Sequence, residues 1–163
     1  MSGPVSLRLA QAADRPVVER PVQLEQHDLS AITGDLPGDD GLFAVRGLDR
    51  FFAEPGGAAY LIELDGSPVG VALVRPVEGR AFVHSFFVVR AVRRRGVGTD
   101  AALALLATDD GPWTIAFVSR YDAAARFWRD VVARAGVAWT EEQRDHAGET
   151  FTWLRLDPAP RSP

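Results

Sequence analysis

The sequence contains the stretch Val88-Val89-Arg90-Ala91-Val92-Arg93-Arg94-Arg95-Gly96-Val97-Gly98, between a segment rich in Val and Phe and a segment rich in Ala and Leu. Four of the six residues from Arg90 to Arg95 are arginine, although the whole chain has a net charge of −4. Glycines let consecutive backbone N–H groups turn toward one point, and the N-terminus of a following helix adds positive potential there. We therefore predict an anion-binding loop, with a solvated basic loop that contains a glycine turn as the alternative.

Several classes of anion compete for such a loop. An ATP-binding P-loop requires Gly-Lys-Ser/Thr, and this chain has no lysine. Residues 96–101 formally fit the dinucleotide fingerprint G-x-G-x-x-A, but six residues separate Val89 from Gly96 and only one further strand–helix unit follows. Nucleic acid would need a broader basic face, and the net charge of −4 argues against one. None of these three ligands fits the loop well.

Hydrophobic periodicity predicts strands and helices on both sides of this loop. Asp65-Gly66 supplies the positive φ angles of a tight hairpin turn between two strand-like runs. Pro21 is expected to kink or split the first helix. We expect strands at 5–9, 58–64, 69–75, 81–89, 113–118, 137–142 and 150–156, and helices from residue 14 onward and at 42–52, 99–108 and 124–135. The order of elements is then β α α β β β α β α β β.

Length and composition limit the class of protein. The 163 residues are 47% hydrophobic, which suffices for the core of one domain, expected at 5–157, with a disordered Pro-rich tail at 158–163. The absence of cysteine excludes disulfides and thiolate chemistry. The longest purely apolar run, Ala101 to Ala107, is too short to cross a membrane, and the N-terminus lacks a signal-peptide pattern. We therefore expect a cytoplasmic protein with no membrane partner.

The stretch from Val88 to Gly98 resembles the strand-to-loop segment of the GNAT superfamily of acyl-CoA-dependent N-acetyltransferases, which has the form V-x-x-x-x-Q/R-x-x-G-x-G/A. The predicted order of elements is similar to that of the superfamily over nearly the whole chain. Residues 23–30 and Phe127-Trp128-Arg129 look closest to uncharacterised bacterial predicted acetyltransferases. The resemblance implies a single α/β domain in which a mixed, mostly antiparallel sheet of about seven strands is flanked by about four helices.

By this resemblance, acetyl-CoA is the acyl-donor co-substrate and lies along the loop and the strand before it. Backbone N–H groups from Arg94 to Thr99 would hold the pyrophosphate, and the pantetheine arm would pair with the main chain around Val88. An N–H near Val88 would polarise the thioester carbonyl in the gap between residues 87–89 and 118–122. The implied cofactor-binding residues are Phe87, Val88, Val89, Arg93, Arg94, Arg95, Gly96, Val97, Gly98, Thr99, Tyr121, Ala124 and Phe127.

The expected catalytic residues depart from the family pattern. Many relatives have N-x-x-A-x-x-F-Y after the next strand, whereas Tyr121 and Trp128 stand at its first and last positions here. Tryptophan cannot transfer a proton, so Tyr121 is the candidate acid for the leaving thiolate, with a packing role as the alternative. Close relatives have glutamate where this chain has Ser85, and the neighbouring His84 is the candidate base, with a plain sheet histidine as the alternative. Consecutive strand residues face opposite sides, so His84 and Ser85 face the acceptor together only if a bulge intervenes.

Acidic residues gather in the two regions where the resemblance places the acceptor. They are Asp28, Asp35, Asp39, Asp40, Asp49, Glu54, Glu141, Glu142 and Glu149. Such a field would attract a cationic amine, although acidic runs are more often just solvated.

We therefore predict transfer of an acetyl group from acetyl-CoA to a primary amine of a small molecule or peptide, by direct attack in a ternary complex. The alternative is an acyl-CoA-binding sensor or interaction module with weak or no turnover. A homodimer is a further expectation from the family, while no metal and no nucleic-acid partner are expected.

Overall fold

Seven strands and four helices, with two short 3-10 segments, make up residues 3–158, which are the residues that the computed structural model describes. The strands are β1 (Val5–Leu9), β2 (Ala58–Leu64), β3 (Ser67–Val77), β4 (Arg80–Val88), β5 (Trp113–Val118), β6 (Ala138–His146) and β7 (Glu149–Asp157). The helices are α1 (Arg15–Thr33), α2 (Arg50–Ala53), α3 (Val97–Leu106) and α4 (Asp122–Ala135), and the 3-10 segments are η1 (Ala12–Asp14) and η2 (Arg90–Val92). Apart from Pro158, the predicted tail lies outside the described residues.

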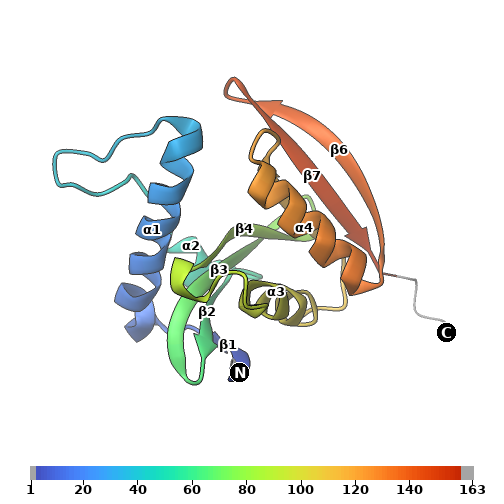
Figure 1. Cartoon of the computed structure of the whole chain (residues 1–163), viewed down its shortest axis with the longest axis horizontal. Helices are drawn as coiled ribbons and strands as arrows, with labels where there is room; N and C mark the ends of the chain where they lie inside the picture. The colour runs from blue at the N-terminus through green and yellow to red at the C-terminus, as the bar shows by residue number, and fades with distance from the viewer. Residues whose placement is uncertain (1–2, 159–163) are drawn as a thin grey trace.

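The strands form one sheet in the order β1-β2-β3-β4-β5-β7-β6 (Figure 1). Every neighbouring pair is antiparallel except β4 and β5, whose parallel pairing covers only Ala81–Val83 and Trp113–Ile115. Both strands continue beyond these residues, to Val88 and Val118, without further pairing to each other. The sheet therefore opens between β4 and β5 at the carboxyl ends of the two strands, and the expectation of a mixed, mostly antiparallel sheet is confirmed.

The turn between β2 and β3 has the predicted chemistry. Asp65 and Gly66 have φ angles of 51° and 76°, the positive values that a two-residue hairpin turn requires at both central positions. The hairpin fixes the register of the half of the sheet that supports β4.

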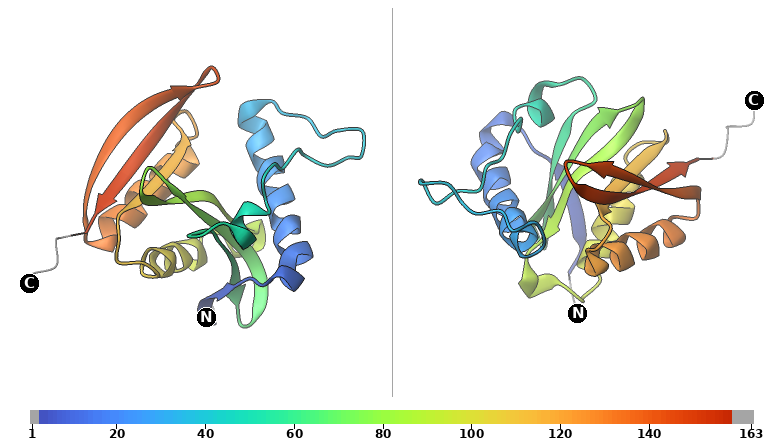
Figure 2. Two further views of the ribbon diagram at one scale, coloured as in Figure 1. Left: turned by 180° about the vertical axis from the view of Figure 1, so that it is seen from behind. Right: turned by 90° about the horizontal axis from the view of Figure 1, so that it is seen from above.

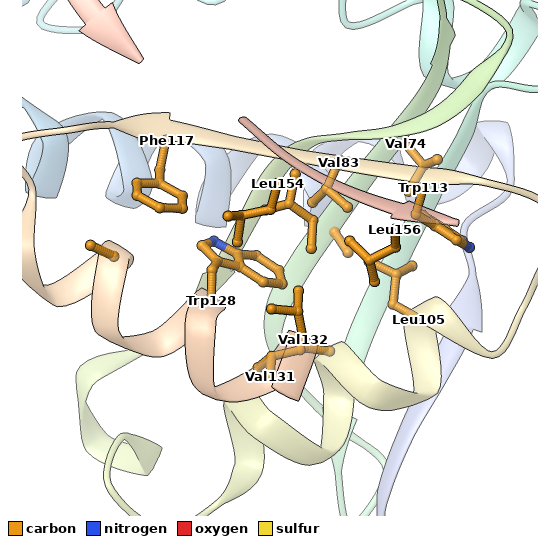
Figure 3. Packing of buried hydrophobic residues seen from close by; sticks show 14 residues of the cluster. Val74, Val83, Leu105, Trp113, Phe117, Trp128, Val131, Val132, Leu154 and Leu156 are labelled. Atoms are coloured by element: carbon orange, nitrogen blue, oxygen red, sulfur yellow. The ribbon is translucent and has the colours of Figure 1, made fainter. Parts of the chain in front are cut away.

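Apolar side chains fill both faces of the sheet. On one face, α3 and α4 contribute Leu105, Val131 and Val132, which are fully buried against Leu154 of β7 (Figure 3). On the other face, α1 contributes Val18 and Val22, packed against β2 and β3. Figure 2 shows α1 on one side of the sheet and α3 with α4 on the other. Complete burial of a Leu or Val contributes about 1.5–3 kcal/mol, so these two layers hold the strand ends that frame the opening.

Pro21 was predicted to kink or split the first helix, and it does not split it, because α1 runs unbroken for 19 residues. Proline removes one backbone donor from the helix. Val18 and Val22, which flank that position on the buried face, are 0% and 2% exposed, and their packing holds the helix in place.

The prediction of a helix at 42–52 is wrong, because only its last three residues, 50–52, are helical, as the start of the four-residue α2. Gly41 and Gly47 have φ angles of 75° and 72°, which a right-handed helix excludes. Leu42 is 54% exposed, so the apolar residues of this segment do not form one buried stripe. The loop is held at Phe43, whose backbone N–H and C=O both bond the Gln23 carboxamide, at 2.8 and 2.9 Å.

Candidate active site

A cavity of about 580 Å³ lies where β4 and β5 separate. Its walls come from β4 and β5, the loop before α3 with the start of that helix, the first two turns of α4 and one face of α1. The face of α1 contributes Glu25, Asp28 and Leu29, whose spacing of three and four residues places them on one side of the helix. The cavity thus joins the arginine–glycine loop to the opposite side of the sheet.

The main chain of β4 is open along this cavity. Val89 N–H donates to Val69 O of β3 at 2.8 Å, so the N–H of the preceding residue, Val88, points the other way, into the opening. Gly70 lies opposite Val88, and a Cβ built on Gly70 would stand 2.1 Å from Phe87 O. The close approach of β3 fixes the position of this open edge.

A β-bulge reorients the strand at the two candidate catalytic residues. Leu73 pairs with Ser85 and Val74 pairs with Val83, which leaves His84 as the extra residue of β4. His84 lines the cavity, while Ser85 is buried. The bulge that the sequence analysis required for both residues to face the same region is therefore present.

The loop before α3 has the backbone expected of an anion site. Arg94 and Gly96 have φ angles of 60° and 82°, and Gly96 is the N-cap of α3. The first N–H bonded back into the helix is that of Asp100, which donates to Gly96 O at 2.9 Å. The N–H groups of Val97, Gly98 and Thr99 precede it and belong to the helix end, where backbone donors have no partner within the helix.

Two of the four arginines are held by α1. Arg93 donates to Asp28 at 2.6 Å and through Nε to Val88 O at 2.9 Å, and its guanidinium lies 5.1 Å from the centre of the Phe87 ring. Arg90 donates to the other carboxylate oxygen of Asp28 at 2.7 Å. Burial raises the pKa of Asp28, but the hydrogen bonds from Arg93 and Arg90 outweigh it, so that the pKa lies below its usual range. The loop is therefore anchored to α1 by an ion pair.

Glu25 of α1 reaches β4 at the bulge, and the sequence analysis missed it. Its Oε1 accepts a hydrogen bond from Phe86 N–H at 3.2 Å, while Oε2 is buried and makes no regular hydrogen bond within residues 3–158. Burial raises the pKa of Glu25 to about 7, although the Ser85 hydroxyl and Phe86 N–H favour its charged form. The sequence does contain a pattern that could have identified Glu25. Val18, Val22, Glu25 and Leu29 recur at intervals of four, three and four residues, which places this acid on the core-facing side of the helix.

The two predicted proton-transfer side chains both line the cavity, from opposite walls. His84 lies 5.1 Å from the Phe51 ring, and burial, together with nearby Arg75, lowers its pKa. Tyr121 stands at the N-terminal cap of α4, where its N–H donates to Val118 O at 2.9 Å.

Trp128 also lines the cavity but packs mainly into the core. Its ring is 7% exposed and makes edge contacts with Phe86 and Phe127, with centroid distances of 5.0 and 4.9 Å. Figure 3 shows it among Phe117, Val132 and Leu154.

Most of the residues expected to bind acetyl-CoA meet at this cavity. Those that line it are Phe87, Val88, Arg93, Arg94, Gly96, Gly98, Thr99, Tyr121, Ala124 and Phe127. The side chains of Val89, Arg95 and Val97 do not, since Val97 is 1% exposed in the core and Val89 packs against apolar clusters. Their backbones remain in the loop and the helix end.

The acidic regions are largely neutralised by arginine. The acids that form ion pairs are Asp28, Asp49, Glu54, Glu141, Glu142 and Glu149. Of the nine acids expected near the acceptor, Asp28 alone lines the cavity. Among residues 3–158 there is no cluster of three potential metal-ligating side chains, and no helix there is long and apolar enough to span a membrane.

An α/β domain whose sheet opens beside a glycine loop at a helix N-terminus has backbone donors for a phosphate group next to an open strand edge. The model of the acetyltransferase (GNAT) family matches residues 24–129, and the chain belongs to this family.

Solved structures with the same fold cover nearly the whole chain. An acetyltransferase from Thermus thermophilus is 22% identical with a TM-score of 0.71, over 96% of this chain and 99% of that one. The ribosomal-protein-S18-alanine N-acetyltransferase of Escherichia coli is 10% identical with a TM-score of 0.68, over 98% and 97%. A GNAT family acetyltransferase from Elizabethkingia anophelis with acetyl-CoA bound is 12% identical with a TM-score of 0.64, over 94% and 97%. No curated protein matches this chain in sequence.

Proposed function

We propose that this protein transfers an acetyl group from acetyl-CoA to a primary amine, by direct attack of the amine in a ternary complex. The observation that carries the proposal is the continuous cavity that connects the N–H groups at the start of α3 with Glu25, His84 and Tyr121. A ligand that occupies its whole length has a phosphate end at the loop and a reactive end in the opening of the sheet.

The donor end of the cavity favours acetyl-CoA. The pyrophosphate would accept hydrogen bonds from the N–H groups between Arg94 and Thr99, and Arg94 would add positive charge beside them. The pantetheine arm would extend along the open edge of β4, and the Val88 N–H would bond the thioester oxygen as negative charge develops on it. A Cβ on Gly98 would stand 3.4 Å from the Phe127 ring and 3.7 Å from a Val88 methyl group, so a glycine here keeps this passage open.

The acceptor end supplies proton transfer. The amine nitrogen attacks the carbonyl carbon, the C–S bond breaks with its electron pair on sulfur, and the leaving thiolate takes a proton. Tyr121 is the proposed donor of that proton, because its side chain lines the cavity from the wall that α4 forms, opposite β4. The acceptor is a small molecule or a peptide, and its reactive group is a primary amine.

A second candidate function is an acyl-CoA-binding module without turnover. The observation in its favour is Trp128, which occupies the position where many relatives have a tyrosine and is buried against Phe86 and Phe127. In that case the cavity would bind acetyl-CoA and no amine would be acetylated.

Thermal unfolding with acetyl-CoA, NADPH or ATP at equal concentration tests the donor. A ligand at 100 times its Kd stabilises the protein by about 2.7 kcal/mol, which raises the Tm of a domain of this size by roughly 5–10 °C. We expect this rise with acetyl-CoA alone, and a rise with NADPH alone would contradict the proposal.

Release of CoA in the presence of a panel of primary amines then separates the two functions. Since the chain has no cysteine, a thiol reagent detects only the released CoA. Turnover supports the transferase, whereas binding of acetyl-CoA without turnover supports the module.

A further inference from the structure

We propose that Glu25 is the general base that accepts a proton from the acceptor amine, and that Ser85 positions its carboxylate. This inference rests on the proposed function and assigns the base within the same site. It makes α1 a catalytic element and leaves His84 with a different role.

The position of Glu25 is fixed by its own helix and by β4. It lies on the same buried face of α1 as Val18 and Val22. Those two valines fill the core, whereas Glu25 lines the cavity. Phe86 N–H holds one carboxylate oxygen at 3.2 Å, and the Ser85 hydroxyl interacts with the same carboxylate. Two consecutive residues of β4 thus orient the carboxylate.

The other carboxylate oxygen, Oε2, is the part of Glu25 that would do the chemistry. It is buried and has no regular hydrogen-bond partner within the described part of the chain, although it belongs to a residue that lines the cavity. A buried acceptor without a partner costs about 1–3 kcal/mol, and more when it is charged. An ammonium or amine N–H in the cavity would satisfy it.

Within the part of the chain that the structure describes, no cation forms an ion pair with Glu25. On α1, Asp28 raises the pKa of Glu25 by charge repulsion, but less than burial does. On the loop, Arg93 and Arg90 both bond Asp28. The other titratable groups that line the cavity are His84 of β4, Arg94 of the loop and Tyr121 before α4. A carboxylate in these surroundings exchanges its proton near pH 7, which suits a base for an amine.

His84 is less suited to this role. Burial and Arg75 lower its pKa, which makes the ring a weaker base, and its ring packs against Phe51 of α2. We assign His84 to the wall of the acceptor site.

The proton balance is complete without a further reactant. The acceptor ammonium gives one proton to Glu25 Oε2, and the neutral amine forms the N–C bond as the C–S bond breaks. The nitrogen then loses its second proton to solvent, Tyr121 protonates the leaving thiolate in our assignment, and the Tyr121 phenolate takes a proton back from solvent. Glu25 returns its proton to solvent before the next cycle.

The test compares Glu25→Gln, Glu25→Asp and Ser85→Ala with the unaltered protein. Glu19→Gln is the matched control, because Glu19 lies on the exposed side of the same helix and pairs with Arg15. The probes are acetyl-CoA with benzylamine, glycinamide and spermidine, and the readouts are kcat against pH and the rise in Tm with acetyl-CoA.

We expect kcat of the unaltered protein and of Glu19→Gln to increase with pH through an apparent pKa of about 7. Glu25→Gln should lose about 100-fold or more in kcat and should lose this pH dependence, while its Tm still rises with acetyl-CoA. Glu25→Asp should restore part of the activity, and Ser85→Ala should shift the apparent pKa upward.

Two results would overturn the inference in distinguishable ways. If Glu25→Gln keeps the activity and pH profile of the unaltered protein, the base lies elsewhere and the proposed function stands. If the unaltered protein binds acetyl-CoA but acetylates none of the amines, the proposed function fails and the role of Glu25 fails with it.

Discussion

Arg93 and Asp28 form a 2.6 Å hydrogen bond that joins the loop before α3 to the helix on the other side of the cavity. Arg93 also bonds Val88 O, so one guanidinium links α1, β4 and the loop. In our proposal, α1 borders the acceptor and the loop binds the donor. The ion pair therefore couples the geometry of the two substrate sites.

We predict that Asp28→Asn weakens acetyl-CoA binding about tenfold. The substitution removes the charge that holds Arg93 and Arg90, and a hydrogen bond to a charged group contributes about 1.5–3 kcal/mol, reduced here because Arg90 is largely exposed. Isothermal titration of acetyl-CoA measures the change. Asp130→Asn, which breaks the exposed Asp130–Arg134 pair of α4, is the control. Equal Kd values for both variants would show that the Asp28 ion pair does not support the loop.

We predict that Glu25→Gln stabilises the protein at alkaline pH. The pKa of Glu25 is about 7 in the folded protein, against an ordinary value of 4.5. Because the folded state binds the proton more tightly, this group's contribution to stability is present below pH 4.5 and is lost as the pH rises through 7. The free energy of unfolding lost through this group at alkaline pH is up to about 3 kcal/mol. The Glu25→Gln variant does not lose it, because glutamine does not titrate.

Urea unfolding at pH 5, 7 and 8.5 checks this prediction, since the advantage of Glu25→Gln over the unaltered protein should grow with pH. Glu19→Gln serves again as the control. A difference that stays constant across the three pH values would mean that Glu25 does not titrate in this range.

We predict that Tyr121→Phe lowers kcat about 100-fold without changing acetyl-CoA binding, because it removes the proposed proton donor and keeps the ring. The chain has one other tyrosine, Tyr60 of β2, and Tyr60→Phe is the matched control. Steady-state kinetics with saturating acetyl-CoA give kcat, and thermal unfolding gives binding. Full activity in Tyr121→Phe would leave Tyr121 with a packing role only.

We predict that Gly98→Ala separates stability from binding. Alanine favours a helix over glycine by about 1 kcal/mol, so the Tm without ligand should stay level or rise. The new methyl group would stand 3.4 Å from Phe127 and 3.7 Å from Val88, beside the N–H groups proposed for the pyrophosphate. The rise in Tm with acetyl-CoA should therefore shrink, and an undiminished rise would place the ligand elsewhere.

The sequence predicted the features that depend on residues close together in the chain. Asp65-Gly66 determined a hairpin turn because both positions require positive φ. The stretch from Arg90 to Gly98 predicted an anion-binding loop at a helix start, and α3 does begin directly after Gly96. The same stretch, with the order of elements, pointed to the family that the family model confirms.

Local patterns failed where distant packing decides. The apolar spacing of 42–52 resembled a helix, but Gly47 and the bonds from Gln23 to Phe43 hold the segment as a loop. Pro21 does not split α1, because the buried residues on either side of it, Val18 and Val22, hold the helix against the sheet.

The candidate base depended on tertiary structure throughout. Glu25 and Phe86 are 61 residues apart in sequence, and nothing local brings them together. The packing of α1 against the bulge in β4 removes the Glu25 carboxylate from water and leaves Oε2 with no regular hydrogen bond among residues 3–158. The sequence by itself thus determined the fold and the donor loop, because turns and helix ends are local. The tertiary structure alone decided which acid is desolvated, because burial is a property of the whole fold.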